Sequence, residues 1–260
     1  AVFVLVVILF TTIDSNVLSD KEAVPLVEAV FAQVTPQGGV MSAQGESLEQ
    51  VRVYVDRTMS MRPFTTQRQS PYFNLLKGLD ELLAGSVQFY GFGYPSDQGD
   101  QVVQTVEPVL LEEPTQYTFV NNDYGPLFSK LSPTATHLVI SDGVQSEPEQ
   151  GERFAGLVSS IGRWIKQGGV FSLIAFRAPY EGTYYHEAPT VGQIEYNCDD
   201  RPFYIFGFFP SVKVKTELLD ILKGGGVSPF YSLTVGEASA SVQARANKPP
   251  EDPTAPRGPR

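Results

Sequence analysis

Two apolar stretches that each end in an aspartate restrict the possible folds of this chain. The first, Val51–Asp56, alternates β-branched and aromatic residues and runs straight into the acid, which is typical of a buried strand. The second, His137–Gly143 (HLVISDG), reaches its acid at Asp142. In open α/β sheets, ligands bind in the crevice beyond the carboxyl ends of the strands. We therefore expect both carboxylates to lie at one edge of a sheet.

The loop after the first stretch offers more oxygen atoms. Asp56 is followed by Thr58 and Ser60, which gives the pattern D-x-T-x-S. An acid and two hydroxyls on one short loop suit a hard divalent cation, but such residues also cap helices by accepting backbone N–H groups. Arg57 and Arg62 are close in sequence, and a cation beside the carboxylates would make a metal ion unnecessary. The loop by itself leaves these interpretations open.

Together the two stretches resemble the von Willebrand factor A family. Its metal-ion-dependent adhesion site combines a D-x-S-x-S loop after the first strand, a Thr from a middle loop and an Asp after the fourth strand. The segment Asn121–Phe128 (NNDYGPLF) is similar to the family's T-D-L-G-x-x-L and places Asn122 where the Thr is expected. The resemblance covers roughly residues 49–235. It implies that Mg²⁺, or Mn²⁺ or Ca²⁺, is held by Asp56, Thr58, Ser60, Asn122 and Asp142, with one position left for an acidic group of a partner.

The remaining pattern predicts alternating strands and helices, with residues 94–114 as a loop. Further strands are expected over Val87–Gly93, Tyr117–Val120, Leu138–Ser141, Val170–Phe176, Phe203–Phe209 and Tyr231–Val235. Helices are expected over Ser70–Ala84, Gly125–Leu131, Glu152–Lys166 and Lys213–Lys223. The nearly continuous apolar run Val170–Phe176 is typical of a buried parallel strand. This order predicts an α/β fold, a doubly wound (Rossmann-like), mostly parallel sheet flanked by helices.

The chain divides into four regions. Residues 1–15 are apolar up to Asp14 but fall short of the about 20 residues that span a bilayer. We expect them to be a membrane anchor, or a remnant of one, that begins as a hydrophobic helix; the alternative is a first buried strand. Residues 16–48 form a linker with one helix, 49–235 the domain, and 236–260 a proline-rich tail. The anchor predicts a membrane-attached protein with its domain in a periplasmic or extracellular space.

The segment Arg177–Pro202 is long for a connection in an α/β fold. It is rich in tyrosine, and tyrosine and arginine dominate the energetics of protein interfaces. It is therefore either a contact surface for other proteins or a packed β-hairpin that covers the sheet edge. The candidate contact residues are Tyr184, Tyr185, His186 and Arg201.

Composition excludes several function classes. A net charge of −10 and a pI near 4.7 argue against nucleic-acid binding, which requires clustered Lys and Arg. A single cysteine, Cys198, rules out an internal disulfide. A phosphatase of the haloacid dehalogenase type needs a second acid two positions after the first, and position 58 is Thr. Nucleophile-elbow, P-loop and dinucleotide motifs are absent from the sequence.

We therefore expect a membrane-anchored, non-enzymatic module for protein binding or adhesion, which takes a divalent cation and an acidic partner group. The alternative is a metal-independent accessory subunit of a larger membrane complex. The amide of Asn122 in place of a Thr hydroxyl favours that alternative.

Overall fold

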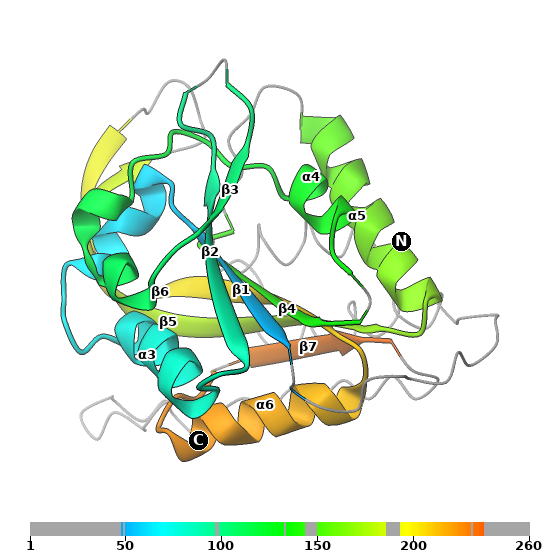
Figure 1. Cartoon of the computed structure of the whole chain (residues 1–260). Coiled ribbons are helices and arrows are strands. Elements are labelled where there is room, and N and C mark those ends of the chain that lie inside the picture. Colours follow the sequence, from blue (N-terminus) through cyan, green and yellow to red (C-terminus); the bar gives the residue numbers. More distant parts are fainter. Residues whose placement is uncertain are drawn as a thin grey trace, which may run out of the picture.

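The computed structural model describes residues 48, 50–96, 99–132, 134–143, 150–185, 193–229 and 231–236 (Figure 1). The strands are β1 (Val51–Asp56), β2 (Val87–Gly93), β3 (Val102–Thr105), β4 (Thr136–Ser141), β5 (Val170–Tyr185), β6 (Gln193–Phe209) and β7 (Tyr231–Val235). They form one seven-stranded sheet in the order β3-β2-β1-β4-β6-β5-β7. The pairs β1–β2 and β1–β4 are parallel, whereas β2–β3, β4–β6, β5–β6 and β5–β7 are antiparallel.

The sheet is thus mixed and mostly antiparallel, so the prediction of a doubly wound (Rossmann-like), mostly parallel sheet is wrong. The error concerns β5 and β6, which pair Phe171 with Phe208 and Phe176 with Phe203 in antiparallel register. A continuous apolar run indicates that both faces of a strand are covered, but it carries no information about strand direction. Residues 186–192, which join these strands, are too few for a parallel crossover, which takes a dozen residues or more.

The third strand was also misplaced by the sequence pattern. β3 lies within the stretch 94–114 that was expected to be a loop, and it pairs with the carboxyl half of β2. The expected strand Tyr117–Val120 is instead an irregular segment in which Phe119 forms an isolated bridge with Thr58. Most side chains of β3 are exposed, so it lacks the apolar alternation that identifies a buried strand.

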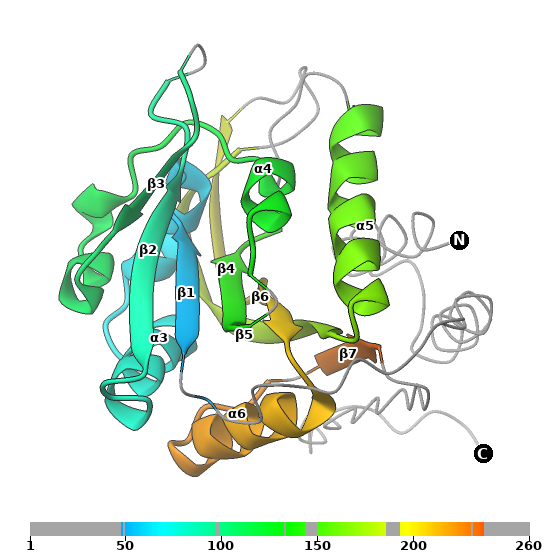
Figure 2. The ribbon, with the colours of Figure 1, turned by 45° about the vertical axis from the view of Figure 1, so that its right-hand side comes forward.

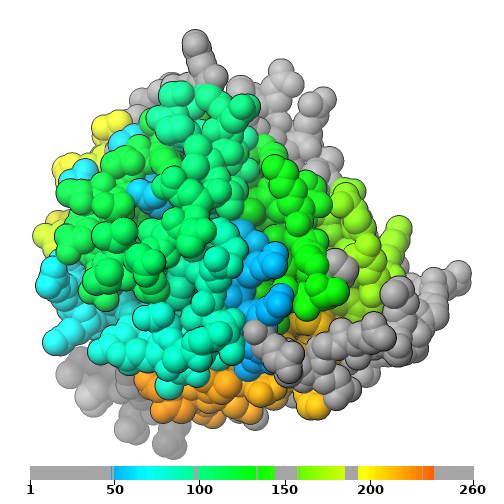
Figure 3. Space-filling model, in the orientation of Figure 1, coloured from blue at the N-terminus to red at the C-terminus, as the bar shows by residue number. Residues whose placement is uncertain are grey.

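The helices pack on the two faces of the sheet. They are α3 (Pro71–Leu82), α4 (Tyr124–Ser129), α5 (Gln150–Lys166) and α6 (Val212–Gly224), with 3₁₀ helices η1 (Met59–Thr65), η2 (Pro108–Glu112) and η3 (Pro114–Gln116). Helices α3 and α6 cover one face, and α4 and α5 cover the other (Figures 1 and 2). Figure 3 shows α3 in cyan and α6 in orange side by side along the lower edge of the molecule. The predicted start of α3 is confirmed, since Ser70 Oγ accepts a hydrogen bond from the Phe73 amide and Pro71 follows it.

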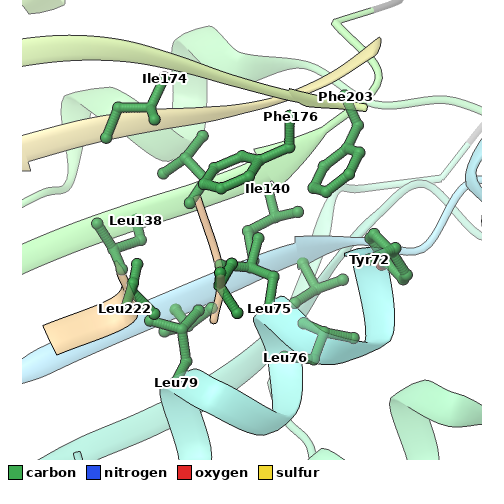
Figure 4. Close-up of a cluster of buried hydrophobic side chains, with 14 of the residues drawn as sticks. Tyr72, Leu75, Leu76, Leu79, Leu138, Ile140, Ile174, Phe176, Phe203 and Leu222 are labelled. Carbon is green, nitrogen blue, oxygen red and sulfur yellow. The ribbon is translucent and has the colours of Figure 1, made fainter. Parts of the chain in front are cut away.

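The strands bury side chains on both faces because they alternate between two cores. Val53 and Val55 of β1 point toward α3 and α6, whereas Tyr54 points toward α4 and α5. Figure 4 shows part of the first core, where leucines of α3 meet β4, β5, β6 and α6 through Leu75, Leu76, Leu79, Leu138, Ile140, Ile174, Phe176, Phe203 and Leu222. This two-sided packing fixes the positions of the strand ends that carry the acids.

No helix among the described residues combines the length and apolar character needed to cross a membrane. The expected anchor (1–15), nearly all of the linker (16–48) and nearly all of the tail (236–260) lie outside the described residues. The described elements β1 to β7 fall within the range 49–235 that was assigned to the domain.

Candidate functional site

Two parallel strands bring their carboxyl ends to the same edge of the sheet. In the β1–β4 pair, Val55 lies opposite Ile140, so the next residues, Asp56 and Ser141, also meet. Asp142 follows directly. Parallel pairing with no register shift between these strands is therefore what brings the two predicted acids together.

The Asp56 carboxylate is fully buried and accepts three hydrogen bonds. Its Oδ1 accepts from the Thr58 backbone amide at 2.9 Å. Its Oδ2 accepts from Ser141 Oγ at 2.7 Å and from Asn122 Nδ2. These three donors are neutral, so they orient the carboxylate without compensating its charge.

The remaining predicted ligands surround this carboxylate. The hydroxyl oxygens of Thr58 and Ser60 lie 3.0 Å apart. Asp142 is buried, and its Oδ1 lies 3.5 Å from the same Ser141 hydroxyl that contacts Asp56. Thr58 is buried and Ser60 is half-buried. The structure thus gathers all five sequence-predicted residues, and Ser60 lies on the accessible side.

Ser141 is a central residue of this site that the sequence reasoning missed. Its hydroxyl donates to Asp56 and accepts from the Gly143 amide at 3.2 Å. The buried Tyr124 hydroxyl lies 2.7 Å away; because the Ser141 proton is directed to Asp56, Tyr124 donates to Ser141. Aligning the two strand ends would have found Ser141, which stands opposite Asp56. No sequence signal points to Tyr124.

The electrostatics of the site disfavour the charged form of Asp56. Burial, with the neighbouring Asp142 carboxylate as the second cause, raises the pKa of Asp56 to about 7, although hydrogen bonds from Ser141 and Thr58 act in the opposite direction. Arg57 does not relieve this, because its guanidinium points to Gln116 and the Phe119 ring. Arg62 is exposed. A proton or an added cation therefore stabilises Asp56 near neutral pH.

The donor set suits a hard cation. It consists of carboxylate, hydroxyl and amide oxygens, which are the ligands of Mg²⁺ and Ca²⁺ in proteins. Within the described parts of the chain there is no cluster of three or more His, Cys, Asp or Glu that could hold a metal ion. A cation here would therefore rely on two carboxylates, neutral oxygens and water. Because Asn122 directs its amide nitrogen to Asp56, its Oδ1 is the atom that would serve as a ligand.

The predicted contact segment Arg177–Pro202 is a β-hairpin formed by the outer parts of β5 and β6. Arg201 is buried in it, with its guanidinium carbon 4.8 Å and 4.5 Å from the ring centres of Tyr180 and Tyr184. The segment is thus a β-hairpin, as one of the two alternatives had it, although most of its β6 side chains are exposed. Arg201 is a packing residue whose guanidinium stacks on these rings. Tyr184 is half-buried. His186 and the side chain of Tyr185 lie outside what the structure describes.

The hairpin lies beside the loop that carries Ser60 (Figure 1). The rings of Phe64 in η1 and Tyr180 in the hairpin are 4.9 Å apart and meet edge to face. Among the described residues of the hairpin, the large apolar side chains that are exposed are Ile194 and Tyr196, at 38% and 36%. The sequence reasoning missed both of these residues.

Comparisons of the chain with protein-family models, curated proteins and solved structures give no match. The resemblance to the von Willebrand factor A family therefore rests on the motif residues alone and stays a prediction.

Proposed function

We propose that this chain is a non-enzymatic protein-binding module that takes a divalent cation at Asp56, Thr58, Ser60, Asn122 and Asp142, and through it an acidic group of a partner protein. The observation that carries the proposal is the Asp56 carboxylate, which is fully buried, bonded only to neutral donors, and adjacent to a second carboxylate. Burying a charge is costly unless an opposite charge compensates it. A divalent cation supplies that compensation for both acids.

The position of the site supports binding to an external group. Ser60 and Gly143 are partly accessible, whereas Asp56, Thr58 and Asn122 are buried. A cation bound to the buried oxygens of Asp56, Thr58 and Asn122 would have its free coordination positions on the accessible side, between Ser60 and Gly143. Mg²⁺ commonly keeps several water ligands in proteins, and a carboxylate of a partner would replace one of them. The cation explains how a chain with a net charge of −10 attracts an acidic group.

The hairpin supplies a second contact area in this proposal. Ile194 and Tyr196 are exposed on the hairpin, whose strand β5 contacts η1, so a partner bound at the cation would also reach Tyr184. Tyr185 and His186 stay contact candidates on the sequence alone. Attachment to a membrane through residues 1–15, and a periplasmic or extracellular location, belong to the same proposal and rest on the apolar terminus. We propose binding rather than hydrolysis because Thr58 stands where a phosphatase of the considered type needs its second acid.

A second candidate is the metal-independent accessory subunit of a larger membrane complex. It is favoured by the closed hydrogen-bond pattern in which Asn122 donates to Asp56 and the Thr58 and Ser60 hydroxyls contact each other. With an Asp56 pKa of about 7, a proton would take the place of the cation. In that case the edge would be a structural feature and the partner would be held elsewhere.

Titration calorimetry of the full chain with Mg²⁺ and Mn²⁺ at pH 8, where Asp56 is mostly ionised, tests the first candidate. We expect binding by the parent, no detectable binding by Asp56→Ala, and unchanged binding by Asp80→Ala. Asp80 is a matched control because it is an exposed acid on α3. A folded parent that binds neither ion would rule out the cation site and favour the accessory subunit.

A further inference from the structure

We infer that Arg57 is a positioning residue that holds the segment Gln116–Asn122 between the ends of β1 and β2, and thereby places Asn122 against Asp56. This inference rests on the proposed cation site, of which Asn122 is a ligand. It assigns a role to the arginine inside the D-x-T-x-S loop, whose side chain points away from the carboxylates.

The segment is inserted between two strand ends through backbone hydrogen bonds. On the β1 side, the Phe119 amide donates to the Arg57 carbonyl at 3.0 Å, and the Met59 amide donates to the Phe119 carbonyl at 2.9 Å. On the β2 side, the Tyr94 amide donates to the Asn121 carbonyl at 2.7 Å. Asn122 follows directly, so its distance from Asp56 depends on how the segment sits in this gap.

The Arg57 side chain fixes the same segment from its other end. Its Nε donates to the Gln116 carbonyl at 2.7 Å and its Nη2 to Gln116 Oε1 at 3.1 Å. Its guanidinium carbon lies 4.9 Å from the centre of the Phe119 ring. Arg57 is buried, and charge-assisted hydrogen bonds of this kind are stronger than neutral ones. One side chain thus contacts the segment at two points, three residues apart.

Two glycines of β2 make room for this arrangement. A Cβ atom at Gly91 would lie 2.3 Å from Arg57 Cδ, and one at Gly93 would lie 2.5 Å from Phe119 Cδ2. Gly93 also has φ +147°, a conformation that side chains with a Cβ rarely adopt. Gly91 therefore leaves space for the Arg57 side chain, and Gly93 leaves space for Phe119 of the segment that Arg57 holds.

Regular secondary structure does not hold Asn122. Residues 117–123 belong to no helix or strand, and the short helix α4 begins only at Tyr124. The backbone position of Asn122 therefore depends on the contacts of the preceding residues, and from that position its amide reaches Asp56. Removing a group that contacts a metal ligand, and not the metal itself, typically lowers metal affinity by about 10- to 100-fold.

The test compares Arg57→Met with Arg62→Met in the full chain. Arg57→Met keeps an unbranched stem next to Gly91 and removes the guanidinium. Arg62 is an exposed arginine in η1, so its substitution makes the same change of charge near the site. We expect Mg²⁺ affinity, measured by calorimetry, to fall about tenfold in Arg57→Met and to stay within about twofold of the parent in the control.

A double-mutant cycle separates positioning from general destabilisation. If Arg57 acts through Asn122, adding Arg57→Met to Asn122→Ala weakens Mg²⁺ binding no further than Asn122→Ala alone. Additive losses would overturn the inference. Should Arg57→Met fail to fold, Gln116→Leu removes one acceptor of the guanidinium and takes its place in the same cycle.

A readout without metal keeps this inference distinct from the proposed cation site. The side-chain amide resonances of Asn122, assigned by their loss in Asn122→Ala, are expected to shift in Arg57→Met and not in Arg62→Met. Unshifted resonances in a folded Arg57→Met variant would overturn the positioning role. If the resonances shift in Arg57→Met and not in Arg62→Met, but the parent binds no Mg²⁺, the cation site is refuted and the role of Arg57 stands.

Discussion

The two ends of the β1–β4 pair each bury a titratable side chain, and the contacts differ. At the start of β4, His137 lies with Nε2 2.9 Å from the Ser132 carbonyl and Nδ1 3.4 Å from the Tyr54 hydroxyl. Burial lowers its pKa to about 4. At the carboxyl end, burial and Asp142 raise the pKa of Asp56 to about 7. Each environment disfavours the charged form of its group.

The consequence differs because the two groups have different ordinary charge states. A neutral imidazole is the usual form of histidine at pH 7, so His137 is satisfied by its neutral partners and acts as a core residue. An aspartate is usually ionised at that pH, so Asp56 requires a proton or a cation. Burial of a titratable group therefore indicates a functional site only where its environment opposes its ordinary charge state.

The largest effect we expect is a pH dependence of stability that comes from Asp56 in metal-free protein. The folded state binds a proton at Asp56 more tightly than the unfolded chain does, so the free energy of unfolding falls as pH rises from about 4 to about 7. The slope reaches at most about 1.4 kcal/mol per pH unit. In the parent, His137 opposes this trend, so urea unfolding of His137→Phe should show it clearly.

The double variant Asp56→Asn/His137→Phe supplies the baseline from all other titrating groups. A slope in His137→Phe that equals this baseline would contradict the assignment to Asp56. Saturating Mg²⁺ at pH 8 should restore stability in His137→Phe and leave the double variant unchanged.

The next effect has the opposite sign and comes from His137. Because its folded pKa is about 4 and its ordinary value is 6.5, the unfolded chain binds a proton more readily, and stability falls as pH decreases from about 6.5 to about 4. Urea unfolding of Asp56→Asn should show this loss of stability at acid pH, and the double variant Asp56→Asn/His137→Phe should lack it. Equal slopes in the two proteins would show that His137 does not titrate in this range.

A smaller effect is expected from Ser141, which orients Asp56. Ser141→Ala removes the hydroxyl that contacts Tyr124 and that donates to Asp56, and it should lower the free energy of unfolding by about 1–3 kcal/mol. Ser141→Ala/Tyr124→Phe should lose less than the sum of the single changes, because both partners are then removed. Ser129→Ala, on the exposed end of α4, is the control. A strictly additive double variant would mean that the two hydroxyls do not interact.

The smallest effect concerns Tyr196, an exposed residue of the hairpin. Tyr196 is partly exposed, and its ring lies 5.8 Å from the Arg201 guanidinium and 6.0 Å from the Tyr180 ring. Tyr196→Ser should change the free energy of unfolding by about 0.5 kcal/mol and leave Mg²⁺ affinity unchanged, as measured by denaturation and calorimetry. Altered Mg²⁺ affinity would show that the hairpin is coupled to the site at the strand ends.

Local patterns predicted many elements well. The strand expected at Val87–Gly93 has those bounds, and the stretch running into Asp56 is strand β1. Helix α3 begins after Ser70, as its cap residue and Pro71 predict. Side-chain alternation, capping and proline act within a few residues, so one sequence is enough to reveal them.

The site was predicted in part. The five proposed ligands do lie together, and their role as ligands stays a prediction. Asp56 and Asp142 were named because parallel strands carry their ends to a common edge, and Thr58, Ser60 and Asn122 because of the motif resemblance. Ser141 was missed because its position opposite Asp56 depends on the register between β1 and β4. Tyr124 was missed because its contact with Ser141 depends on how α4 packs on the sheet. The direction of Arg57 was equally open, since it depends on the space above Gly91.

The sequence by itself determined where most of the strands and helices lie and which acids end two of the strands, because those signals come from neighbouring residues. Only the tertiary structure decided that β5 and β6 are antiparallel, that β3 forms the edge, and that Arg57 points to Gln116. Strand direction depends on how the chain turns and on which apolar faces meet, and a periodic apolar pattern is the same in both directions. The raised pKa of Asp56 likewise arises only because folding buries the side chain beside Asp142.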